Sequence, residues 1–261
     1  MDTKSLRHRS FLRYLLAAIA VVAFTAVTAS AARFGTMCQE NYQNGWQHTL
    51  PYVWERCAYF NNELDDTDTK VFYYSLVGAK PTWENTSDQY YLDNVDLFYG
   101  STHGGAWSTA SVWAMYDQNQ LAYSSSMRLG DEANRLSIFS TYSCETLKFS
   151  DGNLWLRMGP IFRGGLRYAT GSYDTFWDGL TTDETGEDYA DNLQAGYSIK
   201  YSWSDGNSDW WVDNDIAVMA TGTNSTNCFS RLDGMTWRNF TAYPRLMDAQ
   251  IGYYCYRYWS Q

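Results

Sequence analysis

One histidine and one cysteine form the pair of residues in this chain best suited to nucleophilic chemistry. His103 follows the apolar run VDLFYG within Ser-Thr-His-Gly-Gly, and Cys144 follows the apolar run LSIFSTY within Ser-Cys-Glu-Thr. A deprotonated thiol is a strong nucleophile, and an imidazole can accept and return a proton near neutral pH. The two residues therefore predict a Cys–His catalytic pair, provided that the fold brings them together.

Two glycines after the histidine fit the same chemistry. Gly104 and Gly105 have no side chain to block a substrate carbonyl that approaches the backbone. We expect the backbone N–H groups of Gly104 and of Cys144 to donate hydrogen bonds to the oxyanion that forms during acyl transfer.

The elements that must position these residues are predicted to be short strands. Five segments are rich in β-branched, aromatic and aliphatic residues: 71–77, 95–100, 136–142, 166–172 and 216–221. The second and third are nearly continuous apolar runs, which are typical of strands covered on both faces in a parallel sheet. If these two strands are parallel neighbours, His103 and Cys144 lie together at the carboxyl edge of the sheet.

A helix between the last two strands completes the alternation. Tyr189, Leu193 and Tyr197 recur at a spacing of four, which predicts an amphipathic helix over residues 187–203. Strand–helix alternation predicts an α/β fold with a mostly parallel sheet flanked by helices. Two assignments stay open: residues 71–77 are alternatively the end of a helix that begins near Glu63, and residues 106–134 form either a helix or a hairpin insertion.

The two ends of the chain differ from the middle in amino-acid composition. Residues 1–31 combine Lys4 and three arginines with an apolar run and Ala29-Ser30-Ala31, which is the pattern of a cleaved secretory signal peptide. The apolar run, residues 15–27, is shorter than the roughly 20 residues of a spanning helix. Residues 32–261 are predicted to form one domain, and the aromatic-rich residues 230–261 an added β-hairpin that packs on it.

Five cysteines follow the predicted signal peptide, and an odd number leaves at least one without a partner in the chain. Export to an oxidising compartment favours disulfides. The simplest disulfide pairing joins cysteines that lie near the same end of the chain, Cys38 to Cys57 and Cys228 to Cys255. It leaves Cys144 as a free thiol. The sequence alone does not establish connectivity, so other pairings remain open.

The His103 and Cys144 blocks resemble the signature of the caspase-like cysteine peptidases of clan CD. VDLFYGSTHGG is similar to the His-Gly block of that group, and IFSTYSCET to its Cys block, with a Ser-Cys-Glu run most like that of legumains and gingipains. The resemblance covers residues 93–147. It implies a caspase-like three-layer α/β fold, a dyad of His103 and Cys144, and an oxyanion hole that includes Gly104. The whole chain also resembles a family of secreted proteins of unknown function.

The composition of the chain and the motifs that it lacks exclude several other functional classes of protein. With 19 Lys and Arg against 29 Asp and Glu, the chain lacks the basic footprint of a nucleic-acid binder. No phosphate-binding loop, dinucleotide fingerprint, HExxH or GxSxG is present, so no cofactor is expected. Asp205 to Asp209 resembles the start of a calcium loop, but Trp210 replaces the required glycine, so we expect a turn and no metal site.

The sequence therefore predicts a secreted cysteine hydrolase that cleaves an amide bond of a peptide or protein substrate. The alternative is a non-catalytic binding module or an inactive relative that uses an aromatic surface, with Trp210-Trp211 and Tyr253-Tyr254 as candidates. The state of Cys144 discriminates between them, because a nucleophile is free and reachable whereas a structural cysteine is bonded or inert.

Overall fold

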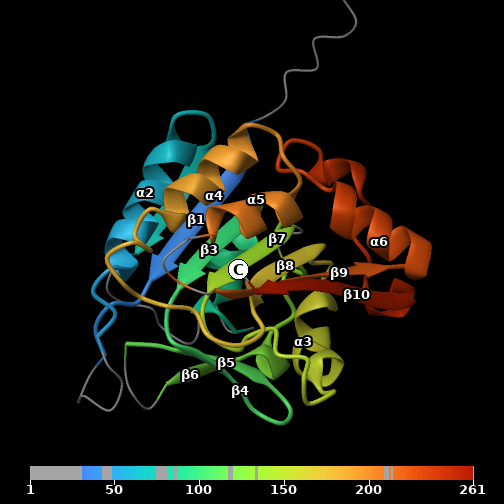
Figure 1. Cartoon of the computed structure of the whole chain (residues 1–261). Helices are drawn as coiled ribbons and strands as arrows, with labels where there is room; N and C mark the ends of the chain where they lie inside the picture. Colours follow the sequence, from blue (N-terminus) through green and yellow to red (C-terminus); the bar gives the residue numbers. More distant parts are fainter. Residues whose placement is uncertain are drawn as a thin grey trace, which may run out of the picture. The chain divides into compact units, whose positions relative to one another are not determined.

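A seven-stranded sheet forms the middle layer of the structure (Figure 1). The computed structural model describes residues 31–42, 49–74, 82–84, 87–116, 120–132, 135–208, 212 and 214–260. Residues 32–261 form one compact unit. The expected signal peptide, apart from Ala31, lies outside the described residues.

The sheet has the order β10-β9-β8-β7-β3-β1-β2, and five of its strands run parallel. Strand β9 is antiparallel to β8, and β10 is antiparallel to β9. The strands are β1 (Arg33–Cys38), β2 (Thr69–Tyr74), β3 (Leu97–Ser101), β7 (Ile138–Tyr142), β8 (Tyr168–Ser172), β9 (Asp215–Gly222) and β10 (Tyr253–Ser260).

Helices cover both faces, because alternate residues of each central strand are apolar on either side. Leu97 and Tyr99 of β3 pack on one face, and Phe98 between them packs on the other. The first face is covered by α2 (Val53–Asp65), α4 (Thr185–Gln194), α5 (Ile199–Gly206) and α6 (Ser225–Gly234). The second is covered by α3 (Leu154–Phe162) and by a small antiparallel sheet (Figure 1). The predicted three-layer α/β architecture is confirmed.

The five predicted strands correspond to β2, β3, β7, β8 and β9. Residues 69–74 form β2 and the preceding helix α2 ends at Asp65, so the helical alternative for this segment is wrong; residues 75–77 lie outside the described part. The prediction of one helix over residues 187–203 is also wrong. Gly196, with a φ of 83°, ends α4 in the left-handed conformation, and the Ser198 side chain then caps α5 by accepting from the Tyr201 N–H.

The second open segment, residues 106–134, forms short strands and no α-helix in its described part. Residues 106–134 contribute to a three-stranded sheet of β4 (Gly104–Ala106), β5 (Ser111–Ala114) and β6 (Leu121–Tyr123), followed by the short 3-10 helix η5 (Ser124–Ser126).

The predicted hairpin within residues 230–261 is wrong, because β10 pairs with β9 instead. Two further 3-10 helices, η6 (Phe240–Ala242) and η7 (Asp248–Gln250), lead into β10.

Both expected disulfides are present. Cys38–Cys57 joins the end of β1 to α2, and Cys228–Cys255 joins α6 to β10. Cys144 is the free cysteine. No helix in the part of the chain that the structure describes has the length and apolar character required to span a lipid bilayer.

Replacing both Cys228 and Cys255 with alanine should lower the stability of the fold. The bridge closes a loop over a separation of 27 residues, and loss of that constraint on the unfolded chain costs about 3–4 kcal/mol. The expected drop in Tm is about 10 °C by circular dichroism. Cys144→Ala removes a thiol without opening a loop and serves as the control; an equal drop in both variants would contradict the prediction.

Candidate active site

The two sequence blocks meet at the carboxyl ends of β3 and β7. The strands are parallel neighbours, and their register pairs Ser101 with Tyr142. One step beyond, the Thr102 N–H donates to the Tyr142 carbonyl at 3.3 Å. The expected placement of His103 and Cys144 at one edge of the sheet is therefore confirmed.

A small cavity of about 110 Å³ opens at this edge, and His103 and Cys144 both line it. The strand ends, helix α2 and the segment after β8 form its walls. The lining residues are Leu50, Val53, Arg56, Ser101, Thr102, His103, Tyr142, Ser143, Cys144, Phe176 and Asp178. A few polar groups set among apolar walls are characteristic of small-molecule and substrate sites.

Gly104 packs directly against the cysteine block. A Cβ atom at this position would lie 2.6 Å from the Cys144 carbonyl oxygen and 2.8 Å from the Ser143 Cβ. Gly105, by contrast, has room, since its nearest neighbour would be a Val112 methyl at 3.5 Å. Gly104 therefore holds the His103 segment and the Cys144 segment at close backbone contact.

The turn after Cys144 has an unusual backbone. Glu145 has a φ of 55°, the only positive φ at a non-glycine residue among those described. The turn is fixed to the end of β8, because the Glu145 N–H donates to the Asp174 carbonyl at 2.7 Å and the Leu147 N–H to the Ser172 carbonyl at 2.7 Å. Left-handed non-glycine residues cost free energy and occur preferentially at functional sites.

The thiol of Cys144 contacts the backbone of Phe176. Its Sγ lies 3.4 Å from the Phe176 nitrogen, which donates to it, and 3.5 Å from the Phe176 carbonyl oxygen. Burial raises the pKa of the Cys144 thiol above its ordinary value; the Phe176 N–H opposes this, and the charges of Glu145 and Asp174 add to it. The ligand-free protein therefore holds Cys144 as a protonated thiol at neutral pH.

Tyr42 holds His103 in place. The His103 N–H donates to the Tyr42 hydroxyl at 3.0 Å, and the two rings lie 5.0 Å apart between centroids. The same hydroxyl lies 2.8 Å from the Thr102 Oγ1. Burial raises the pKa of Tyr42 above its ordinary value, so this hydroxyl stays protonated. Tyr42 fixes the backbone and one ring face of the candidate base.

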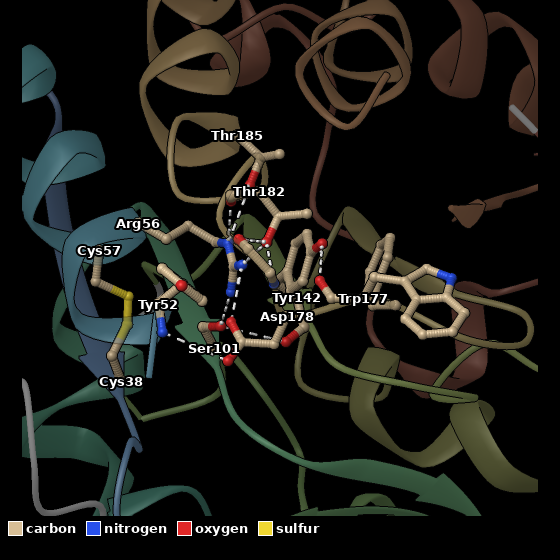
Figure 2. Close-up of polar contacts among 12 residues, drawn as sticks. Cys38, Tyr52, Arg56, Cys57, Ser101, Tyr142, Trp177, Asp178, Thr182 and Thr185 are labelled. Atoms are coloured by element: carbon tan, nitrogen blue, oxygen red, sulfur yellow. Dashed lines mark hydrogen bonds and ion pairs between the residues drawn. A yellow bond between two sulfur atoms is a disulfide. The ribbon is translucent and has the colours of Figure 1, made fainter. Parts of the chain in front are cut away.

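Arg56 of α2 forms the charged wall of the cavity, and Figure 2 shows its polar contacts. Its side chain is fully buried and pairs with Asp178 at 3.2 Å. Its guanidinium carbon lies 3.8 Å from the centroid of the Tyr142 ring. Its other hydrogen-bond partners are Ser101 Oγ, Thr182 Oγ1, the Thr182 carbonyl and Thr185 Oγ1. These contacts tie α2, β3 and residues 178–185 together around the cavity.

Sequence analysis missed Tyr42, Arg56 and Asp178. They lie in three separate segments, and each is an ordinary residue type outside any motif. One signal was available for Arg56, because it precedes Cys57 and shares the helix that the Cys38–Cys57 disulfide anchors (Figure 2). Other candidates lie elsewhere: Trp210 and Trp211 are outside the described residues. On β10, Tyr253 is exposed, whereas Tyr254 is half-buried against the core.

Gly104→Ala should destabilise the fold, whereas Gly105→Ala should not. The new Cβ at position 104 meets the Cys144 carbonyl oxygen and the Ser143 Cβ, neither of which can rotate away, and overpacking of this kind costs about 1–3 kcal/mol. Urea denaturation of the two variants measures the difference. Equal stability of the two variants would show that the contact between Gly104 and Cys144 is loose.

The Cys144 thiol should react with iodoacetamide only at alkaline pH in the ligand-free protein. Because the folded-state pKa is raised, the thiol stays protonated to a higher pH than in the unfolded chain, where thiols have a pKa of about 8.5. The midpoint of the rate–pH curve should lie above that of the urea-unfolded protein. A midpoint at or below the unfolded value would contradict the assignment, and Cys144→Ala gives the background.

The described fold and site fall within one known protein family. No curated protein matches the chain. A family model described as a domain of unknown function, DUF6345, matches residues 37–259, which run from within β1 to β10. The match includes Tyr42, Arg56, His103, Cys144 and Asp178. The chain belongs to the DUF6345 family.

Proposed function

We propose that this protein is a cysteine hydrolase that cleaves an amide bond of a peptide or protein, with Cys144 as nucleophile and His103 as general acid/base. The observation that carries the proposal is the parallel pairing of β3 with β7, which puts both residues in the wall of one small cavity. The resemblance of the two blocks to caspase-like peptidases supports the same roles for the same residues.

The reaction begins when a substrate carbonyl enters the cavity beside Cys144. The sulfur attacks the carbonyl carbon while His103 takes the thiol proton, and the carbonyl oxygen receives the electron pair. The Gly104 and Cys144 N–H groups stabilise this oxyanion. When the intermediate collapses, the C–N bond breaks and His103 returns the proton to the leaving amine.

Water completes the cycle. His103 removes a proton from water, the hydroxide attacks the thioester carbon, and the S–C bond breaks. The carboxylic acid leaves and Cys144 regains its proton. Because burial raises the pKa of the free thiol, His103 has to deprotonate Cys144 with substrate present, rather than hold a preformed ion pair.

Arg56 acts as a positioning residue in this scheme. Each of its three guanidinium nitrogens already donates to Ser101, Thr182, Thr185 or Asp178, so its role in this scheme is to shape the cavity wall and not to bind substrate. The apolar members of the lining, Leu50, Val53 and Phe176, favour a small uncharged substrate group at this position.

The proposed location is outside the cytoplasm. Two disulfides are compatible with an oxidising compartment, and the expected signal peptide would direct the chain there.

A binding module is the second candidate function, favoured by an aromatic strip on β10. The Phe149 and Tyr258 rings lie 4.2 Å apart between centroids, and Tyr256 stacks beside them. Trp155 of α3 contacts Tyr254 and Tyr256 along the same strip. Partly exposed rings of this kind stack on flat ligands such as sugars.

Cys144→Ala and His103→Ala should each lower amide hydrolysis by a factor of about 10³ or more, because the two residues act as a unit. The measurement is kcat/KM on a fluorogenic peptide library, with circular dichroism to show that each variant folds. Tyr258→Ala, on the aromatic strip, is the control and should keep full activity. Turnover retained in Cys144→Ala would overturn the proposal. Binding of a flat ligand such as a sugar, if it is lost only in Tyr258→Ala, would favour the second candidate function.

A further inference from the structure

Three carboxylates converge at the opposite edge of the sheet from Cys144. Asp88 lies in the 3-10 helix η3 (Asp88–Tyr90) and Asp93 in η4 (Leu92–Asn94), both just before β3. Glu132 lies in the segment before β7. One oxygen atom from each of the three side chains lies within 4.8 Å of the other two. The cluster therefore joins the amino ends of the same two strands whose carboxyl ends carry His103 and Cys144.

Two of these side chains are buried without adequate partners. Asp88 and Asp93 are both 0% exposed. Both carboxylate oxygens of Asp88 and the Oδ2 of Asp93 are buried and have no hydrogen-bond partner. The Oδ1 of Asp93 accepts from the Gly130 N–H at 2.6 Å. A buried carboxylate without partners is rare in proteins, because its desolvation is costly.

The surrounding cations do not pair with these oxygens. Arg245 donates to the carbonyls of Gly130 and Arg135, and Arg128 pairs with the Oδ2 of Asp131 at 3.2 Å. The Oδ1 of Asp131, next to Glu132, is also buried and has no partner. Four carboxyl groups thus share one small region, in which Arg245 is directed to carbonyl oxygens and Arg128 to Asp131.

The crowding has an electrostatic cost. Carboxylates held this close repel one another when they are ionised, and burial weakens the screening by water. A bound cation removes this repulsion.

We propose that Asp88, Asp93 and Glu132 bind a calcium ion that joins η3 and η4 to the segment before β7. Two oxygens bound to one calcium ion at about 2.4 Å lie no more than about 4.8 Å apart, which the three carboxylates satisfy. The donor set is all oxygen, which suits a hard cation and not zinc or copper. Calcium accepts an irregular set of carboxylates, whereas magnesium demands near-octahedral geometry.

The ion would clamp the amino ends of β3 and β7. Glu132 is exposed and gives the ion a path from solvent, and Asp131 supplies a further oxygen nearby. This role is independent of the proposed hydrolase, because it concerns the stability of the strand pair and not the reaction at Cys144.

The test is calcium binding by the folded, chelator-treated protein. Calorimetric titration with CaCl₂ should reveal one site, and Tm should rise by about 5 °C or more at a free calcium concentration about 100 times Kd. No binding and no Tm shift at 5 mM CaCl₂ would overturn the proposal. An equal response to MgCl₂ would overturn the assignment to calcium.

Variants locate the site. Asp88→Asn should abolish the calcium-dependent Tm shift and leave the calcium-free protein as stable as before or more stable, because a buried charge is removed. Glu132→Gln, at an exposed position, should weaken calcium binding at least tenfold and keeps the test available if Asp88→Asn fails to fold. Glu184→Gln, an exposed carboxylate of the α4 N-terminus, is the control. A full calcium response in both cluster variants would overturn the proposal.

Discussion

The parallel pairing of β3 with β7 positions both of the sites proposed for this protein. The register joins Leu97 to Ile138 at one end and Ser101 to Tyr142 at the other. A slip of either strand by one residue would turn the side chains of that strand to the wrong faces of the sheet. At the carboxyl ends the pairing brings His103 beside Cys144, and at the amino ends it brings Asp93 close to Glu132.

Buried charge has hydrogen-bond and ion-pair partners at one end of the β3–β7 strand pair, whereas at the other end Asp88 lacks them among the described residues. Beside the cavity, Arg56 is fully buried but is matched by Asp178, by threonine and serine oxygens and by the Tyr142 ring. Removing one partner of such a pair is strongly destabilising, because the other charge remains buried. At the other end Asp88 has no such match. That contrast is the physical basis for assigning a bound cation to the second end and a positioning role to Arg56 at the first.

Sequence patterns predicted the parts of the fold that depend on local signals. The apolar runs VDLFYG and LSIFSTY correctly indicated two buried strands of a parallel sheet, and the structure meets the condition that they be neighbours. The spacing of the cysteines correctly indicated Cys144 as the free thiol. The break between α4 and α5 was missed, because the period of four continues through Gly196. Arg56, Asp178, Asp88 and Glu132 were missed because each depends on contacts between segments far apart in the chain, which no local pattern records.

The most direct test of the central claim is the reaction of the native, unreduced protein with a library of peptide acyloxymethyl ketones at pH 7, followed by mass spectrometry. These reagents place an electrophilic carbonyl beside the nucleophile, so deprotonation by His103 rather than a low thiol pKa controls their reaction. The account predicts one thioether, on Cys144, that forms rapidly in the native protein and slowly in His103→Ala or after denaturation. Labelling of Cys144 that is no faster in the native protein than in the unfolded chain, or that is unchanged in His103→Ala, would contradict it.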